Sequence, residues 1–435
     1  MSWTSCVRSP MKALSNSIEN ISAFRWAVLA IILVVQVQLE SVSFAPAALA
    51  SPIMASLQLT RTAFGLIMSA VNITVVICVA LGSVLVDRIG LKLALLCGLA
   101  VVSLGAAFQF SVHDLKFFIF ARVIQGIGIA ISYPVLGGLV MAWFSNREQP
   151  YINTIFVAVG FLGTGATMIG TAELFRWLGG SWRRALGGYG VSLLATTIVW
   201  LVIGRNSQHA DSVEKTTAAS LTATKPSSLS TVLAMPVAWM LALGIFAASW
   251  ILEMYFSFVP LFLESRGISL AQADRLASLL PFSGVAGVIA FGLLATRATW
   301  RKHLLWTGCV VVILGSIPLF WGKGAVTSAG LLVAGFGLAG FLPVSITYMM
   351  SLPAMTPPLL AGLVVVANVA TDMAGFIAPL AVGRVSQSSF GLRNTLALFS
   401  WIELVAILVF SCLPAIASGD VVKIEGTTTS SIATI

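Results

Sequence analysis

Twelve long apolar runs, separated by short polar segments, constrain what this chain can fold into. A helix of about 20 residues crosses the hydrocarbon of a bilayer, and these runs approach or exceed that length. In lipid the backbone must satisfy its own hydrogen bonds, which runs of this length do as helices rather than as the strands of a barrel. The sequence therefore predicts an all-α integral membrane protein with twelve transmembrane helices. The runs cover approximately residues 26–50, 62–84, 92–112, 117–144, 152–175, 185–204, 236–263, 277–296, 304–321, 326–350, 359–383 and 395–416.

Composition supports the membrane class and excludes several others. Apolar residues make up 58% of the chain and charged residues 9%, against about 25% charged in soluble domains. The net charge of +9 comes from 24 basic residues spread thinly between the runs, a pattern typical of loops that face anionic headgroups. We therefore expect the lipid bilayer as a partner and no nucleic acid. No nucleophile with a base, metal cluster or phosphate-cradling loop is evident, so we expect neither an enzyme nor a cofactor or metal.

The polar segments divide the chain into two halves. A stretch rich in Ser, Thr and Lys covers residues 205–235 and predicts a flexible cytoplasmic linker. It separates an N-terminal six-helix bundle (26–204) from a C-terminal one (236–416), with a cytoplasmic segment at 1–25 and a cytoplasmic tail at 417–435. An even number of spans places both termini on one side. That side carries 13 basic residues against 10 on the other, which favours a multi-pass inner-membrane protein with cytoplasmic termini.

The second half repeats features of the first at a nearly constant offset. Gly126, Gly128 and Pro134 recur 209 residues later as Gly335, Gly337 and Pro343, and the turn at 82–92 recurs 210 residues later at 292–302. This pattern predicts two pseudo-symmetric bundles, an arrangement that places transporter sites between the halves at the membrane midplane. We expect the four glycines to be close-packing positions and the two prolines to kink their helices.

Four charged residues deep inside the apolar runs are candidates for a functional role: Glu40, Arg122, Glu253 and Asp372, whereas we expect Glu403 to be a peripheral or helix-packing residue. By helix rise, Glu40 and Arg122 lie about 9 Å and about 8 Å from the outer face, so their depths agree. We expect them to form an ion pair that couples a carboxylate to the arginine, although a static structural pair is the alternative. Glu253 and Asp372 also fall in the outer half and are candidates for a proton site, but Glu253 lies near enough to the surface to reach water.

The sequence resembles the major facilitator superfamily over nearly its whole length. Gly82, Asp87, Arg88, Gly90 and Lys92 are similar to the signature between helices 2 and 3, and Arg122, Gln125 and Gly126 to a helix 4 motif of proton-coupled members. The resemblance implies a cytoplasmic latch at Asp87 and Arg88, for which a solvated turn is the alternative. It also implies a cavity between the bundles. The polar and aromatic residues expected to line it are Gln36, Asn72, Gln125, Tyr133, Trp250, Tyr255, Asn368 and Thr371.

The sequence thus predicts a monomeric secondary transporter of a small polar or organic solute, proton-coupled and working by rocking of the two bundles. Helix 5 lacks the Gly-Pro pair usual in drug exporters of the resembled family, and the repeat counterpart of Arg122 is Leu331. The first difference disfavours a drug/proton antiporter and the second a strongly anionic substrate. Trp143 and Phe144 before a charged turn, and the Tyr-Pro pair in helix 4, resemble the organic-anion and cyanate or nitrate-like uptake branches. A proton-driven exporter and a non-transporting assembly factor or sensor are the alternatives.

Overall fold

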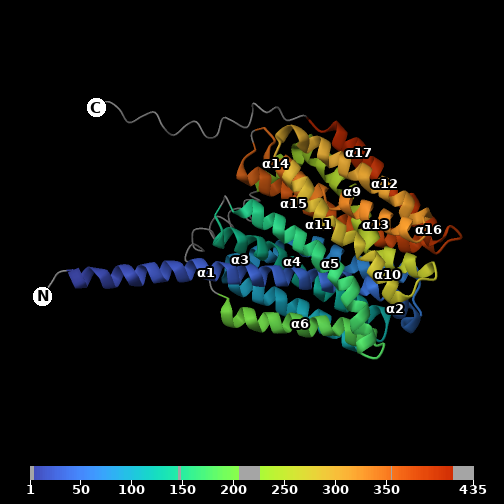
Figure 1. Cartoon of the computed structure of the whole chain (residues 1–435), viewed down its shortest axis with the longest axis horizontal. Helices are drawn as coiled ribbons and strands as arrows, with labels where there is room; N and C mark the ends of the chain where they lie inside the picture. The colour runs from blue at the N-terminus through green and yellow to red at the C-terminus, as the bar shows by residue number, and fades with distance from the viewer. Residues whose placement is uncertain (1–3, 146–147, 205–225, 354, 415–435) are drawn as a thin grey trace.

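The computed structural model describes residues 4–145, 148–204, 226–353 and 355–414, and every element in them is helical. Figure 1 shows two bundles lying side by side, one blue to green and one yellow to red. The first contains α1 (Thr4–Ala48), α2 (Ala50–Leu57), α3 (Arg61–Ala107), η1 (Phe108–Ser111), α4 (Leu115–Trp143), α5 (Gln149–Trp177) and α6 (Trp182–Ile203). The second contains α8 (Pro226–Ala234), α9 (Pro236–Ser265), α10 (Leu270–Ala277), α11 (Leu279–Leu294), η2 (Ala298–Trp300), α12 (Arg301–Trp321), α13 (Ala325–Leu338), α14 (Phe341–Met350), α15 (Pro357–Ser386), α16 (Gly391–Ser400) and α17 (Glu403–Cys412).

Twelve segments in the described ranges are long and apolar enough to cross a membrane, which confirms the predicted fold class. The first span begins at Phe24 and the twelfth ends at Cys412, so both lie at the same end of the molecule. We call this the terminal end and the opposite one the far end. Two segments differ from expectation: α1 begins at Thr4, before the first apolar run, and α8 lies within the expected linker. Residues 205–225 of that linker and the tail at 417–435 lie outside the described residues.

The second and third spans follow each other without a loop and share the label α3, but the helix is sharply interrupted at Gly90. The backbone there has φ 78° and ψ 166°, a region that is essentially restricted to glycine. Leu91 and Val86 on either side are buried, whereas Asp87 and Arg88 are exposed. The turn between the spans therefore needs Gly90 for its geometry.

Three spans of the second bundle are broken into two helices. The eighth divides between α10 and α11, the tenth between α13 and α14, and the twelfth between α16 and α17. Pro343 explains the tenth, because it has no N–H to donate to the carbonyl of Ala339 and its ring crowds that carbonyl. Its repeat counterpart Pro134 lies inside an uninterrupted α4. Related prolines thus break one helix and are accommodated in the other.

The repeated glycines lie at equivalent contacts in the two bundles. A Cβ on Gly126 would lie 2.8 Å from the carbonyl oxygen of Val71 in the second span, and one on Gly335 would overlap that of Leu280 in the eighth. Gly128 faces the backbone of the third span and Gly337 that of the ninth, where an added Cβ would lie 2.6 Å from Val102 N and from Gly308 O, respectively. Each glycine therefore lets two helices approach more closely than any side chain would permit.

We expect Gly126→Ala to destabilise the protein by about 1–3 kcal/mol, because the added methyl overlaps the second span. Gly137 is the matched control on the same helix, since a Cβ there meets no atom within 4 Å. Gly137→Ala should not destabilise the protein, because alanine is favoured over glycine in a helix interior by about 0.5–1 kcal/mol. Unfolding of the purified variants in detergent measures both, and equal effects would contradict the packing account.

Candidate functional site

Phenylalanine rings from both bundles close the far half of the interface. Phe44 of α1 packs edge-on against Phe256 of α9 with ring centroids 5.3 Å apart, and Phe64 of α3 packs in the same way against Phe258 at 5.9 Å. Phe161 of α5 also contacts Phe256, at 5.9 Å. These five residues, which we call the aromatic seal, are buried and exclude water from this side of the interface.

Beyond the aromatic seal, backbone contacts and an ion pair hold the far ends together. Arg61 Nη1 donates to the carbonyl of Ser386 at 2.9 Å, which connects the start of α3 to the end of α15. Gly65 and Gly383 permit this crossing, because a Cβ on Gly65 would overlap the carbonyl of Pro379 and one on Gly383 would overlap that of Arg61. Arg275 Nη2 pairs with Glu173 Oε1 at 2.7 Å. The far end is thus closed by both apolar and polar contacts.

Glu40 lies at the interface with two hydrogen-bond donors from its own bundle. Gln36, one turn earlier on α1, donates its Nε2 to Glu40 Oε1 at 2.9 Å, and the hydroxyl of Tyr133 on α4 donates to the same oxygen at 3.1 Å. Gly160 of α5 leaves room beside them, since its Cβ would lie 2.9 Å from Gln36 Nε2 and 3.6 Å from Glu40 Oε1. The three predicted residues Gln36, Glu40 and Tyr133 therefore form one polar cluster.

Glu253 forms a second cluster that crosses between the bundles. The amide Nδ2 of Asn72 on α3 donates to Glu253 Oε2 on α9 at 3.4 Å, and Gly375 of α15 borders both side chains. Asp372, also on α15, lies close enough to act electrostatically on Glu253, as Glu40 does. Tyr133 experiences the charges of all three acids. Carboxyl groups from both bundles therefore face a common region at the centre of the interface.

The predicted ion pair between Glu40 and Arg122 is not formed. The guanidinium of Arg122 is 1% exposed and donates to three backbone carbonyls instead: Nε to Ile67 O at 3.2 Å, Nη1 to Val42 O at 2.7 Å and Nη2 to Ser43 O at 2.9 Å. Nη1 also donates to Gln125 Oε1 at 3.0 Å. The acid that acts on Arg122 through space is Glu253. Agreement in depth along two helices therefore does not establish pairing.

Pro46 explains why Arg122 is directed at these carbonyls. In an uninterrupted helix the carbonyl of Val42 would accept from the N–H of residue 46, but proline has none. A carbonyl without a donor is costly in lipid, and Arg122 supplies the donor from α4. Arg122 therefore clamps α1 to α4 and to the second span. A proline four residues beyond the carbonyl is a sequence signal that could have predicted this role.

Several other predicted cavity residues lie elsewhere. Tyr255 is fully buried within the second bundle, where its hydroxyl is 2.8 Å from Ser400 Oγ, and Gln125 is fully buried beside Arg122, so these two do not line a cavity. Trp250 is 7% exposed and packs against Phe399. Thr371 accepts a hydrogen bond from Ser249 at 3.2 Å, which connects α9 with α15. Asn368, one turn before Asp372, is exposed.

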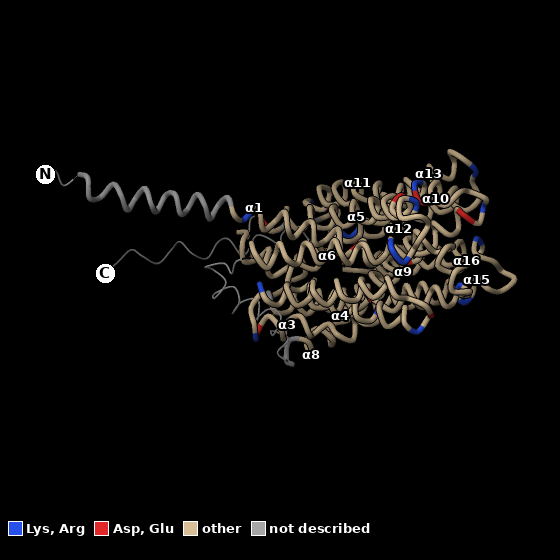
Figure 2. Tube along the Cα trace, turned by 90° about the horizontal axis from the view of Figure 1, so that it is seen from below, with Lys and Arg blue, Asp and Glu red and all other residues tan. Residues whose placement is uncertain are grey.

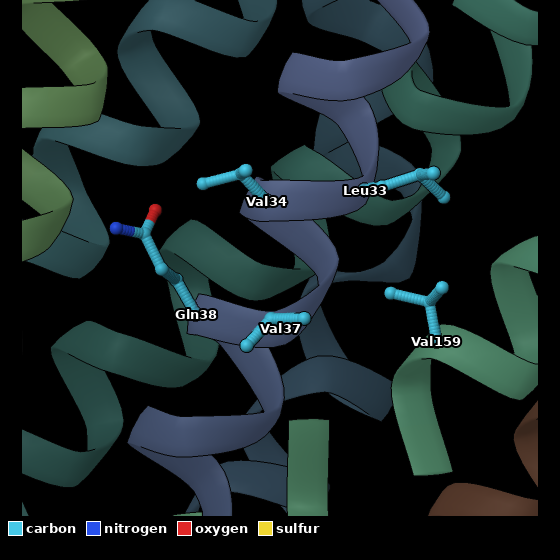
Figure 3. Close-up of a pocket in the computed structure, with 5 residues that line it drawn as sticks. All are labelled: Leu33, Val34, Val37, Gln38 and Val159. Atoms are coloured by element: carbon cyan, nitrogen blue, oxygen red, sulfur yellow. The ribbon is translucent and has the colours of Figure 1, made fainter. Parts of the chain in front are cut away.

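A shallow depression of about 260 Å³ lies apart from these clusters. Figure 3 shows it between Leu33 and Val37 of α1 and Val159 of α5, with Gln38 pointing away. Gln38 donates to Ser192 Oγ of α6 at 2.7 Å, so its amide stabilises helix packing. The lining is aliphatic and supplies no group for recognising a polar solute. Among the described residues, no group of three or more His, Cys, Asp and Glu could hold a metal ion.

Comparison with known proteins agrees with this architecture. The model of the Major Facilitator Superfamily matches residues 29–379. The chain belongs to that superfamily. Its sequence is 20% identical over 298 residues to "Uncharacterized transporter YycB" of Bacillus subtilis (strain 168), covering 68% of this chain and 71% of the relative. It is 25% identical over 245 residues to "Probable L-galactonate transporter" of Escherichia coli (strain K12), covering 54% of each.

Solved structures of the same superfamily share the fold at low sequence identity. A bacterial homologue of the human lysosomal transporter Spinster, in an inward-facing and unoccupied conformation, matches with a TM-score of 0.74 at 14% identity, over 89% of this chain and 96% of that one. The proton:xylose symporter XylE, bound to 6-bromo-6-deoxy-D-glucose, matches with a TM-score of 0.67 at 13% identity, over 90% and 96%. These likenesses establish the fold.

The turn from Gly82 to Lys92, between the second and third spans, lies at the terminal end. Asp87 and Arg88 are exposed, and neither takes part in an ion pair within the described part of the chain. Gly82 packs against the fourth span, where a Cβ on it would lie 3.1 Å from the ring of Pro134, and the carbonyl of Lys92 accepts from Trp200 Nε1 at 3.0 Å. Gly82 and Lys92 thus join the turn to its own bundle, while Asp87 and Arg88 face outward.

We expect Arg122→Leu, which introduces the residue of its repeat counterpart, to destabilise the protein by about 2 kcal/mol, from four hydrogen bonds at ~0.6 kcal/mol each. In a Pro46→Ala background the cost should fall by at least ~0.5 kcal/mol, because the alanine returns an N–H donor to the carbonyl of Val42. Unfolding in detergent of the four members of this cycle measures the coupling. Strict additivity would show that Arg122 does not compensate for Pro46.

Proposed function

We propose that the protein is a proton-coupled secondary transporter of a small polar or organic solute, working by alternating access between its two bundles. The observation that carries this proposal is the group of three carboxyl residues at the bundle interface, Glu40 from one bundle and Glu253 and Asp372 from the other. A carboxyl group between two moving bodies changes its surroundings as they move, so its proton affinity changes with the conformation.

The contact of Asn72 with Glu253 supports coupling between protonation and movement. It joins the two bundles directly, and its strength depends on the charge of Glu253 because a carboxylate accepts a hydrogen bond more strongly than a carboxylic acid. When the three acids are ionised, Glu40 faces like charges across the interface and the two bundles repel each other. Binding and release of protons therefore bias the relative position of the bundles.

The aromatic seal and the far-end ion pair indicate which side is closed. Contacts at Arg61, Phe64 and Glu173 bridge the bundles at the far end. We assign the terminal end to the cytoplasm and the conformation to the inward-facing state, as in the Spinster homologue. The protein then acts as a symporter in the cytoplasmic membrane, and Asp87 and Arg88 are free to form the cytoplasmic latch in the opposite state.

Spin labels at Met141→Cys on α4 and Met350→Cys on α14, in a background without native cysteines, should report a pH-dependent distance. We expect the population of the longer distance to rise at least about fivefold, equivalent to about 1 kcal/mol, from pH 5 to pH 8, because deprotonation creates repulsion across the interface. Pulsed electron resonance on protein in nanodiscs measures the distances without any solute.

The combined Glu40→Gln, Glu253→Gln and Asp372→Asn variant should keep one distribution at both pH values. Glu403→Gln is the control, because Glu403 is a carboxyl group buried in α17, away from the interface, and its removal should leave the pH response intact. A pH response that survives in the triple variant would show that these acids do not couple protons to movement.

A further inference from the structure

The charge and hydrogen-bonding capacity of the central region restrict the solute. The hydrogen bonds of Arg122 use four of its five N–H groups, and the residue is 1% exposed, so a solute cannot reach its guanidinium. Figure 2 shows the other described Lys and Arg residues gathered mainly toward the two ends of the molecule. In the described part of the chain, the centre of the interface therefore has no cation available to neutralise an anionic solute.

The acidic residues at the centre of the interface, in contrast, would attract a cation. Glu40, Glu253 and Asp372 contribute three carboxyl groups to one region, and the side chains that donate hydrogen bonds to them are neutral: Gln36 and Tyr133 for Glu40, and Asn72 for Glu253. Ionised carboxylates away from water are costly unless a positive charge compensates them. An anion entering this region would add repulsion, whereas a cation would remove it.

A separate observation identifies where a donor is missing. Gln36 is 5% exposed, and while its Nε2 donates to Glu40, its Oε1 is buried with no hydrogen-bond partner. An amide oxygen has two lone pairs, and leaving it buried without a donor is unfavourable. Gly160 lets the Gln36 amide lie directly against α5, since a Cβ there would lie 2.9 Å from Gln36 Nε2. The cluster therefore offers an unpaired acceptor next to a carboxyl group.

We propose that the transported solute is an organic cation, an amine or amidine whose N–H groups bind Gln36 Oε1 and Glu40 while Glu253 and Asp372 carry the exchanged protons. This proposal rests on the proposed transport function and adds the chemical class of the solute. An ammonium group has only donors, so it satisfies both acceptors at once, and it adds a positive charge to a region where Arg122 acts through space on Glu253. The ring of Tyr133 adds an aromatic surface at the same place.

This conclusion departs from the leaning of the sequence toward organic anions. That leaning depends on family resemblance alone, at Trp143, Phe144 and the Tyr-Pro pair of helix 4. Arg122, the cation inside the membrane, is engaged by backbone carbonyls and gives no support for anion binding. The acids then determine the sign of the charge that the centre of the interface accepts.

Two sets of solutes matched in size test the assignment: tyramine, tyrosol and 4-hydroxyphenylacetate, and cadaverine, 1,5-pentanediol and glutarate. We expect at least one amine, but neither carboxylate, to raise the melting temperature of the purified wild-type protein by several degrees at millimolar concentration. Gln36→Met, which removes the free acceptor and keeps the length of the side chain, should weaken the amine's apparent affinity at least tenfold, as should Glu40→Gln. Glu403→Gln should retain it.

Stabilisation by a carboxylate, or by no amine of the panel, overturns the assignment. Uptake into proteoliposomes containing a pH-sensitive dye separates this result from a failure of the proposed function. Proton movement driven by a carboxylate would support transport and refute the cationic solute. Binding of an amine without any uptake or proton movement would support the cationic site and refute the transport function. Amine uptake accompanied by proton movement supports both.

Discussion

The first bundle depends on a single guanidinium that supplies hydrogen-bond donors to backbone carbonyls inside the membrane. Pro46 removes the donor that the carbonyl of Val42 would have in a regular helix, and Arg122 replaces it from another helix. The same side chain joins α1, α3 and α4, so local backbone chemistry and tertiary packing are satisfied together. A charge that is costly in lipid is stable here because it meets several partial negative charges at short range.

The two bundles share the glycine positions at which their helices pack, but they differ in the polar residues at the interface. The glycines at 126 and 335, and at 128 and 337, make matching helix contacts in the two bundles. The acidic residues do not repeat in this way. Glu40 accepts hydrogen bonds from side chains of its own bundle, whereas Glu253 accepts one from Asn72 of the other bundle. Duplication therefore accounts for the scaffold, and later divergence accounts for the interface that a solute meets.

Most of the fold could be predicted from the sequence, because span length and apolar composition are local properties. The twelve spans follow from the apolar runs, and the repeated glycines from their constant offset. The break at 278 has the same kind of local signal as the one near Pro343, because Pro281 has no N–H to donate to the carbonyl of Ala277. The break at 401–402 has no equally clear local pattern. The aromatic seal could not be found either, because phenylalanines in membrane helices are frequent and only the packing of two bundles selects the five that meet.

The sequence predicts which residues form the candidate site, but not which of them contact each other. The sequence selects Gln36, Glu40, Asn72, Tyr133, Glu253 and Asp372, and the structure brings them to one region. Helix rise gives depth but not the direction of a side chain around the helix, so the prediction pairs Arg122 with Glu40 rather than with the backbone of α1. Gln125 and Tyr255 are misplaced for the same reason, since both point into their own bundle.

The position equivalent to Arg122 is occupied by Leu331, a fully buried aliphatic residue that cannot donate a hydrogen bond to a backbone carbonyl. The second bundle is also the one whose eighth, tenth and twelfth spans are interrupted. The first bundle is thus held together by the hydrogen bonds of Arg122, whereas the second bundle contains three helix breaks. We expect deformation during the transport cycle to concentrate in the second bundle, whose helices can bend at these breaks, while the first bundle moves as a rigid body.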